Sequence, residues 1–470
     1  MIRIRLSNDN FINDIHPLVR AFLPGEDIEV SYDVSGSEND FILEVIREED
    51  TLCSLSLPDT SKEDRLAMKN VLKCALYRKL ENTLKKSLPW GTLTGIRPTR
   101  LALNKLLKGE TAEDTLRFME DYYLVSPEKA ALSLSIAAKE KRIISGFSDP
   151  ASFSLYVGIP FCPTTCLYCS FPSNALSIWK DRVGEYLTAL EKELDFIAEE
   201  FKGRNLATLY IGGGTPTTLS PEELKRLFLF LGDRFDMKGL REFTVEAGRP
   251  DSIDKEKLKV LKEFGVDRIS VNPQTMNDKT LKLIGRCHTA EETVKAFKLC
   301  REEGFDNINM DMILGLPGET REDVSYTLSE IEKLSPDDLT IHSLALKRGS
   351  ALMERIEEYG SFGLKDPETI LETAYEGAES MGLSPYYLYR QKNMAGNLEN
   401  TGWARPGKEG LYNILMMEEV HSIPAAGAGT VSKNIVSPTD IRRCGNPKDV
   451  DTYIKNIDEM MDRKKRLYKD

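Results

Sequence analysis

From residue 154 onward, short apolar segments alternate with amphipathic ones six times over about 190 residues. This rhythm restricts the fold more than any other feature, because the apolar segments have strand length and the segments between them have helical spacing. Alternation of this kind predicts a parallel sheet with helices outside it. Six units make three-quarters of a TIM-type barrel, so we expect an α/β fold built on a partial (β/α)6 barrel. The expected strands are 154–159, 207–213, 242–247, 267–272, 307–314 and 339–344.

Polar residues and glycines follow the expected strands at their carboxyl ends. In barrels of this kind the active site lies on the loops that follow these ends. Any one such residue has an ordinary structural explanation, since a glycine-rich segment can be a tight turn and a carboxylate can cap a helix. Their recurrence at successive strand ends predicts one site at one rim of the barrel. The residues are Cys162, Cys166 and Cys169 after the first strand, Gly212 to Pro216 after the second, and then Glu246, Gln274, Asp311, His342 and Ala345.

The three cysteines lie in CPTTCLYC, residues 162–169, with the spacing C-x3-C-x2-C. A cubane 4Fe-4S cluster is normally held by four thiolates, so three would leave one iron open to a small-molecule ligand. Zinc is the competing interpretation, because Cys166-x2-Cys169 resembles half a zinc site and Cys287 or His288 could be distant donors. A thioredoxin-like dithiol leaves the third cysteine unexplained. The other five cysteines are scattered and are expected to be small core residues.

Three further parts are expected around the barrel, which we place at 151–350. Residues 1–89 read as a small α+β domain, because four alternating segments are combined with two helical ones. A helical connector follows at 90–150, and 351–470 is expected to form a C-terminal domain that caps the barrel. The alternating segments of the first domain are 2–6, 27–34, 41–47 and 51–57, and its helical segments are 11–22 and 62–88.

The amino-acid composition and net charge exclude some classes of function. The 470 residues are 41% hydrophobic and 29% charged, an ordinary globular balance, and the net charge of −12 argues against a broad nucleic-acid surface. No stretch approaches the roughly 18 uninterrupted apolar residues of a membrane helix. The start, MIRIRLSNDNF, turns polar at once and does not read as a signal peptide. We therefore expect a cytoplasmic protein without nucleic-acid or membrane partners.

The motifs resemble those of the radical S-adenosylmethionine (SAM) enzymes, through the cysteine spacing, the aromatic Tyr168 before the last cysteine, and GGGTP. The closer resemblance is to the oxygen-independent coproporphyrinogen III oxidases (coproporphyrinogen dehydrogenases), over about 155–350. It is carried by YVGIPFC, GGGTP, TVEAGRP, SVNPQ and MDMILGLPGET. The tail YRQKNMAGNLENTGWARPGKEGLYNI and the earlier PWGTLTGIRPTR resemble the HemZ branch of this family. A radical SAM fold is thus expected.

The resemblance implies roles for individual residues. Cys162, Cys166 and Cys169 would hold a 4Fe-4S cluster. The positions that would line the SAM bound to the open iron are Tyr156, Gly213, Gly214, Thr215 and Glu246, of which Tyr156 and Glu246 would be catalytic. Further cofactor-contacting positions are Gln274, Arg286 and Asp311. Positions around a second SAM are Tyr168, Ala345 and Val431. One departure stands out, because Gly158 occupies the place of a family histidine.

The resemblance also implies a reaction. A radical derived from SAM would remove hydrogen from a propionate of coproporphyrinogen III, and loss of CO2 would leave a vinyl group. Two such steps give protoporphyrinogen IX, with a small redox protein of flavodoxin or ferredoxin type as the electron donor. The substrate carboxylates call for fixed cations, and we favour Arg390 and Arg405, flanked by Tyr389 and Trp403. The other candidate cations are Arg286, Lys392 and Lys408.

Two alternatives stay open. One related branch consists of haem chaperones with a His-Asn-x-x-Tyr-Trp motif in the tail, and this sequence lacks that motif. The other alternative is a radical SAM enzyme that acts on a different tetrapyrrole.

Overall fold

The computed structural model describes residues 1–34, 40–95, 97–171, 173–345, 350–354, 366–390 and 398–469. Within these residues the chain forms two compact units, Met1–Lys141 and Arg142–Asp470. The boundary falls inside the helix α5 (Pro127–Ile144). The finer division at residues 89, 150 and 350 stays a prediction.

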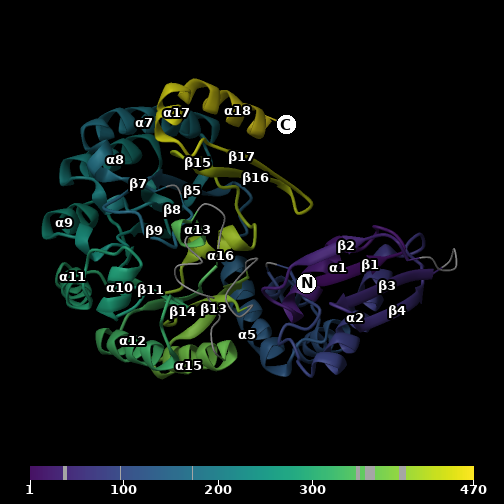
Figure 1. Ribbon diagram of the computed structural model, residues 1–470. Coiled ribbons are helices and arrows are strands. Elements are labelled where there is room, and N and C mark those ends of the chain that lie inside the picture. The colour runs from purple at the N-terminus through teal and green to yellow at the C-terminus, as the bar shows by residue number, and fades with distance from the viewer. Residues whose placement is uncertain are drawn as a thin grey trace. The chain divides into compact units, whose positions relative to one another are not determined.

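The first unit begins with a sheet of strand order β2-β1-β3-β4. Its strands are β1 (Ile2–Leu6), β2 (Ile28–Ser31), β3 (Asp40–Arg47) and β4 (Asp50–Pro58), and the helices α1 (Ile12–Phe22) and α2 (Arg65–Leu84) accompany them (Figure 1). Alternation along β1 buries Ile2, Ile4 and Leu6, so one face of the sheet joins the core of this unit. The helices α3 (Thr99–Leu107), α4 (Ala112–Arg117) and α5 follow.

The second unit contains the barrel. In the described part of the chain its sheet has nine strands in the order β13-β14-β12-β11-β10-β9-β8-β5-β15. The central six are parallel neighbours, as the sequence predicted. They are β5 (Ser152–Ile159), β8 (Asn205–Gly213), β9 (Glu242–Glu246), β10 (Arg268–Ser270), β11 (Ile308–Leu314) and β12 (Asp338–Ser343). The expected partial (β/α)6 barrel is thereby confirmed.

Helices cover the outside of the barrel (Figure 1). They are α7 (Val183–Glu200), α8 (Pro221–Arg234), α9 (Lys255–Glu263), α11 (Ala290–Glu302) and α12 (Arg321–Leu334). Three of them begin with a capping box, at Ser220, Thr289 and Thr320. In each box the cap side chain and the acidic side chain three residues later satisfy each other's backbone N–H groups. These caps fix the residue at which each helix begins and the preceding loop ends.

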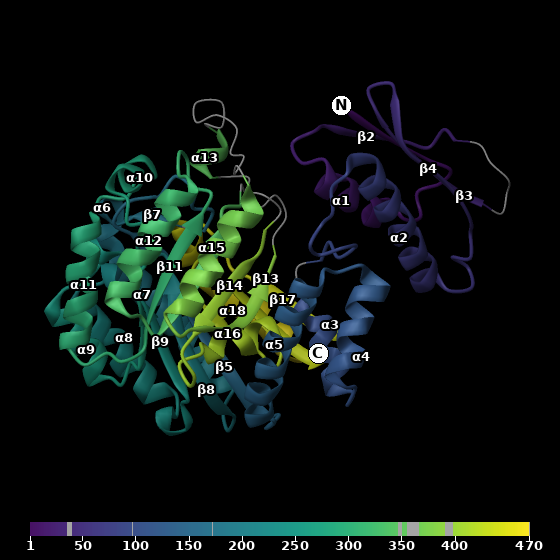
Figure 2. The ribbon, with the colours of Figure 1, turned by 90° about the horizontal axis from the view of Figure 1, so that it is seen from below.

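The C-terminal residues extend the barrel sheet at both of its edges. The strands β13 (Ser384–Tyr389) and β14 (Asn400–Ala404) continue the sheet beyond β12 in antiparallel pairing. At the other edge β15 (Ala425–Ala426) pairs in parallel with β5. The helix α15 (Pro367–Ser380) lies beside α12 in both views (Figures 1 and 2).

A buried ion pair holds the last elements against the barrel. These are the hairpin β16 (Val431–Ser437) and β17 (Asp440–Gly445), followed by α17 (Val450–Lys455) and α18 (Ile457–Lys469). Lys464 on α18 and Glu193 on α7 are both fully buried, and their Nζ and Oε1 atoms are 2.5 Å apart. Glu193 also accepts hydrogen bonds from Tyr453 Oη at 2.6 Å and from Gly427 N at 2.8 Å. The turn after β15 is thus fixed next to β5.

Candidate active site

The cysteine loop leaves the carboxyl end of β5 and is closed by two short strands. These strands, β6 (Phe161–Cys162) and β7 (Asn174–Ala175), pair in parallel, with Cys162 opposite Ala175. Arg249 holds the turn between the first two cysteines: Nη1 donates to Thr164 O and Nη2 to Thr164 Oγ1, both at 3.1 Å. Its Nη1 also lies 3.7 Å from Cys166 Sγ. The loop therefore has a fixed shape of its own.

The cysteine thiols of this loop would lose their protons only next to a bound cation. Burial raises the pKa of the Cys162 thiol to about 11 and also raises that of Cys169. Thiolates at these positions need a bound positive charge, and metal binding would release their protons. Among the described residues, no three His, Cys, Asp or Glu side chains converge on a place for a single metal ion. A cubane assigns its cysteines to different irons, so their sulfurs need not converge.

The glycine-rich segment after β8 lies directly against the cysteine loop. Thr215 N donates to Phe161 O at 2.7 Å, and Thr215 Oγ1 lies 3.6 Å from Cys162 Sγ. A Cβ on Gly214 would stand 2.5 Å from Phe161 O and 3.0 Å from Cys162 Sγ. The close approach thus requires glycine at this position, and it joins GGGTP and the cysteines in one site.

Glu246, at the end of β9, completes this part of the rim. It accepts hydrogen bonds from Tyr210 Oη at 2.6 Å and from Gly213 N at 3.2 Å. Gly213 has a φ of +111°, which a glycine adopts without strain. Burial raises the pKa of Glu246 to about 7, although the Tyr210 hydrogen bond opposes the shift. A carboxyl group in this state favours a ligand with an ammonium group.

Three tyrosine rings stack inside the barrel behind Glu246. The ring centroids of Tyr210 and Tyr412 are 4.6 Å apart, and that of Tyr156 lies 5.9 Å from Tyr210. Tyr412 belongs to α16 (Leu411–Met417), whose first backbone N–H groups, those of Leu411 and Tyr412, donate to the buried Glu242. The strand β9 begins at Glu242 and ends at Glu246, so α16 approaches the site from the opposite end of the barrel.

Gln274 and Asp311 form the next part of the rim. Gln274 has a φ of +67° and is held by two backbone hydrogen bonds, from its N to Asp311 O and from Ile313 N to its O, each of 2.9 Å. Burial alone would raise the pKa of Asp311, but hydrogen bonds with His342, Asn309 and Thr340 outweigh it and hold the pKa below its usual value. The buried Oε1 of Gln274 has no hydrogen-bond partner among the described residues. A buried acceptor without a partner costs free energy unless a bound ligand donates a hydrogen bond to it, so this oxygen fits a site that binds a polar ligand.

Arg286 and Tyr168 belong to the support of the cysteine loop. Arg286 Nη1 donates to Asn272 O at 2.7 Å and to Gly248 O at 3.2 Å, while Nη2 donates to Tyr168 Oη at 3.0 Å. Burial raises the pKa of Tyr168 well above its usual range, so the phenol stays protonated. With both terminal nitrogens engaged, Arg286 is poorly placed to bind a substrate carboxylate.

The structure gives a reason for Gly158 in place of a histidine. A Cβ at Gly158 would lie 2.5 Å from Thr430 Cγ2. Gly158 O accepts a hydrogen bond from Tyr186 Oη at 2.6 Å. The place of the missing side chain is thus taken by the turn that leads into β16. Val431, the first residue of β16, is 53% exposed, and Ala345, which follows β12, is partly buried; their predicted roles stay predictions.

The candidate cations for substrate carboxylates divide between the two ends of the barrel. β13 runs parallel to β12 through their common antiparallel neighbour β14, so Arg390 follows β13 at the rim that carries the site. Arg405 donates from N to Asp337 O and from Nη2 to Ser335 Oγ, both just before β12 begins. Lys408 lies 3.5 Å from Asp306, just before β11.

The preference for Arg405 is therefore wrong, because it lies at the opposite end of the barrel, as does Lys408. Trp403 is buried on β14, where its Nε1 donates to Thr401 Oγ1. Tyr389, the last residue of β13, shares the end of the barrel with Arg390. Lys392 lies outside the described residues.

Several functional candidates escaped sequence reasoning. Tyr210 alternates with Gly212 along β8, so its inward direction could have been predicted from strand periodicity. Arg249 lies in TVEAGRP, a motif at the end of an expected barrel strand, so its position near the cysteine loop could have been predicted from the sequence. Tyr412 left no such signal, because only the path of the C-terminal segment brings it into the barrel.

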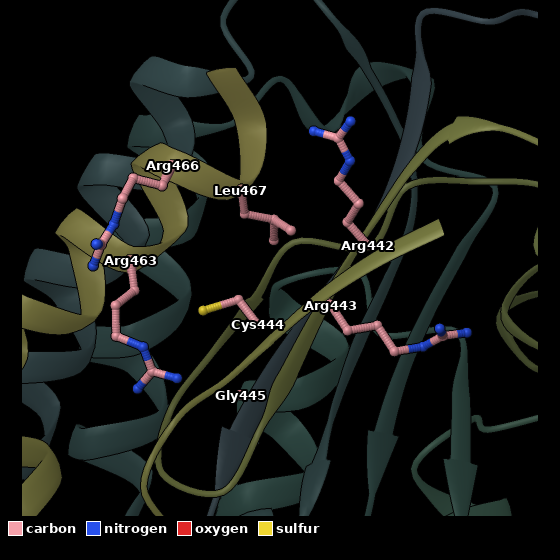
Figure 3. Close-up of a pocket in the computed structure, with 7 residues that line it drawn as sticks. All are labelled: Arg442, Arg443, Cys444, Gly445, Arg463, Arg466 and Leu467. Carbon is pink, nitrogen blue, oxygen red and sulfur yellow. The ribbon is translucent and has the colours of Figure 1, made fainter. Parts of the chain in front are cut away.

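A surface hollow of ≈ 410 Å³ lies apart from this site, between β17 and α18 (Figure 3). The four arginines around it point in different directions, and two of them pair with neighbouring carboxylates, Arg442 with Asp440 and Arg443 with Glu419. We assign this hollow no role in the site. Its lining residues are Arg442, Arg443, Cys444, Gly445, Arg463, Arg466 and Leu467.

The comparisons with known proteins agree with this geometry. The radical SAM superfamily matches residues 156–331, so the fold and the site define a radical SAM protein. The chain is 41% identical over 413 residues to the oxygen-independent coproporphyrinogen-III oxidase-like protein HemZ of Bacillus subtilis, covering 87% of this chain and 82% of HemZ. This chain belongs to the HemZ-like family of oxygen-independent coproporphyrinogen III oxidase homologues, as its motifs predicted.

Two further similar proteins are named for different functions, one an oxidase and the other a heme chaperone. The solved structure of coproporphyrinogen III oxidase HemN from Escherichia coli has 25% identity and a TM-score of 0.53, covering 68% of this chain and 72% of HemN. The heme chaperone HemW of Bacillus subtilis is 34% identical over 264 residues, or 56% of this chain and 66% of HemW. Membership of the radical SAM superfamily implies a 4Fe-4S cluster and SAM. Among the described residues, every helix is too short or too polar to cross a membrane.

Proposed function

We propose that this protein is a radical SAM oxidoreductase that converts two propionates of coproporphyrinogen III into vinyl groups, giving protoporphyrinogen IX. The observation that carries the proposal is the contact of GGGTP with the cysteine loop, beside the partly buried Glu246. The names of HemN and HemZ support the tetrapyrrole substrate.

The residues would divide the work as follows. Cys162, Cys166 and Cys169 would hold the cluster, which together with SAM supplies removal of hydrogen from an unactivated carbon. Glu246 would bind the ammonium group of SAM, and the backbone at Gly213 and Gly214 would let the ligand come close. The polar acceptors at Gln274 and Asp311 would bind its other polar groups.

The interior of the barrel would exclude water from this reaction. Tyr156, Tyr210 and Tyr412 fill the space behind Glu246 with stacked rings. Side reactions of a reactive carbon centre with water are suppressed in a dry, closed site. A second SAM near Tyr168, Ala345 and Val431 is part of the proposal, and so is the binding of a propionate by Arg390.

The proposal includes a small redox protein of flavodoxin or ferredoxin type as the electron donor. It also includes the cytoplasm as the compartment, where thiols stay reduced. All eight cysteines are free in the structure.

The test is anaerobic incubation of the reconstituted protein with coproporphyrinogen III, SAM and dithionite, with the tetrapyrroles analysed by mass. We expect loss of two CO2 and four hydrogen atoms per tetrapyrrole, and one deoxyadenosine for each decarboxylation. Deoxyadenosine without change in coproporphyrinogen III would contradict the substrate and would favour another tetrapyrrole.

A haem chaperone is the second candidate, because the chain resembles HemW over more than half of its length. It predicts tight haem binding and transfer of haem to an acceptor protein without decarboxylation. Titration with haem, followed by absorbance, separates the two candidates.

A further inference from the structure

Arg249 is a buried cation that contacts the cysteine loop. It lies between the end of β9 and the helical turn at Pro250–Ser252, and it is only 3% exposed. Its Nη1 donates to Thr164 O at 3.1 Å and lies 3.7 Å from Cys166 Sγ, while its Nη2 donates to Thr164 Oγ1. A buried charge needs a charged partner, so the partners of Arg249 decide what this cation can do.

The counter-ion Asp251 binds only one edge of this guanidinium group. Its Oδ1 accepts a hydrogen bond from Arg249 Nε at 2.9 Å, and its Oδ2 accepts one from Nη2 at 2.8 Å. Nη1 takes no part in this pair and donates toward the cysteine loop instead. The side chain of Asp251 is 21% exposed, against 4% for that of Arg249, so water screens the negative charge more than the positive one. The pair is neutral as a whole, but its positive end is the one that faces the sulfur.

Two further titratable groups lie near this pair. Burial lowers the pKa of His288 to about 3, so its ring, which lies 3.8 Å from Asp251, stays neutral at pH 7. Arg286 is a second buried cation beside the loop, and its Nη2 donates to Tyr168 Oη. These groups add positive charge or none, so they do not cancel the charge of Arg249.

A cation at this place acts on the charge of a bound cluster. A cluster held by thiolates is negatively charged, and reduction adds an electron to it. Net charge and hydrogen bonds to the sulfurs are among the factors that set the potentials of iron–sulfur clusters. Burial raises the pKa of the Cys162 thiol to about 11, and the charge of Arg249 is one of the influences that oppose this shift. Arg249 thus stabilises negative charge on the sulfurs, and a reduced cluster gains more from it than an oxidised one.

We propose that Arg249 raises the reduction potential of a cluster on Cys162, Cys166 and Cys169, and that Asp251 limits the increase by neutralising part of the charge. This inference rests on the proposed function, because it needs a cluster that accepts an electron. Arg249 acts through Cys166, so it is a positioning residue and not a catalytic one. In the step that it favours, one electron passes from the flavodoxin- or ferredoxin-type donor to the cluster. The donor is oxidised and the cluster reduced, while no bond forms or breaks and no proton moves.

The test uses the full chain with its cluster reconstituted anaerobically, and the variants Arg249→Gln and Asp251→Asn. Redox titration without SAM, followed by electron paramagnetic resonance, gives the ratio of reduced to oxidised cluster at each potential. At the potential where the parent is half reduced, we expect oxidised cluster to exceed reduced cluster about tenfold in Arg249→Gln, a potential lower by about 59 mV for one electron. In Asp251→Asn we expect reduced cluster to exceed oxidised cluster about threefold, because the cation loses a counter-ion that water partly screens. Opposite shifts are the signature of charge, since loosening of the loop would not depend on the sign of the charge removed.

The matched control is Arg301→Gln, which makes the same change at the opposite end of the barrel. Arg301 lies on α11, and its Nη1 is 2.6 Å from Asp337 Oδ2, just before β12 begins. This variant should titrate at the potential of the parent. If Arg249→Gln loses iron, Asp251→Asn decides, because it keeps Arg249 and the hydrogen bonds from Arg249 to Thr164.

The outcomes separate two failures. A reconstituted parent protein that does not cleave SAM with dithionite overturns the proposed function. A parent that cleaves SAM, together with variants that titrate at its potential or both shift in the same direction, overturns the role of Arg249. If only Asp251→Asn retains the cluster, an unchanged or lower potential in that variant overturns this role as well.

Discussion

At the scale of single residues, the candidate site depends on places where only hydrogen fits. Gly212, Gly213 and Gly214 let two loops and a carboxylate come within contact distance of one another. A Cβ at Gly212 would stand 2.8 Å from the Glu246 carboxyl carbon, and one at Gly214 would meet the cysteine loop. Glu246 is the other determining residue, because its burial leaves it half ionised near pH 7.

The first prediction concerns Gly214→Ala. The added methyl group would displace Phe161 O and Cys162 Sγ, so we expect the variant to retain less than half of the iron after anaerobic reconstitution. Gly232→Ala is the matched control, because a Cβ there meets nothing within 4 Å in the last turn of α8. It should keep the iron and should not lose stability, since alanine is the better helix former. Equal iron in both variants would show that GGGTP is not in contact with the cluster.

The second prediction concerns the pH dependence of the metal-free protein. Burial raises the pKa of Glu246 from 4.5 in the unfolded chain to about 7 in the folded one, so the folded state binds the extra proton. Stability from this group is present below pH 4.5 and is lost as the pH rises through 7. Glu246→Gln should therefore gain, relative to the parent, about 3 kcal/mol between pH 4.5 and pH 8, as measured by urea unfolding. The same difference at both pH values would mean that Glu246 does not titrate in this window.

At the scale of elements, strand direction decides which side chains share the site. Arg390 and Arg405 are close in sequence and were equally good candidates, yet β13 runs toward the rim and β14 runs away from it. The barrel strands could be placed from the sequence because each apolar segment carries its own periodic signal. The direction of β13 and β14 carries no such signal, since it depends on pairing with β12. For the same reason, the insertion of Tyr412 beneath Tyr210 was not predictable.

The third prediction separates these two arginines and rests on the proposed function. Arg390→Ala should raise KM for coproporphyrinogen III about 30-fold, which corresponds to a lost charge-assisted pair of about 2 kcal/mol. Arg405→Ala should leave KM within about twofold, because the site lies at the other end of the barrel. Steady-state kinetics with dithionite measures both, and iron content with thermal unfolding monitors the fold. A larger effect from Arg405→Ala would contradict the assignment of the rim.

At the scale of the whole molecule, the two edges of the barrel sheet are closed by residues from the end of the described chain. β15 covers β5, and the turn after it is fixed by Glu193, Lys464 and Tyr453. This turn also supplies Thr430, which occupies the space beside Gly158. The strand that carries the cysteine loop is therefore held in place by contacts made far away in sequence.

The fourth prediction concerns this buried pair. Lys464→Met would leave the Glu193 carboxylate buried without its cation, so we expect a loss of about 3–5 kcal/mol in the free energy of unfolding. The double variant Glu193→Gln/Lys464→Met should recover most of that loss, because no buried charge remains unpaired. Urea unfolding of the parent and the three variants forms a double-mutant cycle. Additive losses would mean that the two charges do not interact.

Glu193 and Lys464 are 271 residues apart in the chain. A ribosome adding about 5–20 residues per second needs roughly 15 to 55 s to travel from one to the other. During most of that interval β5 and the cysteine loop have been synthesised, while β15 and α18 have not. The contacts that hold the turn beside β5 are therefore complete only after α18 has been made, and until then the three cysteines of the loop belong to an unfinished barrel.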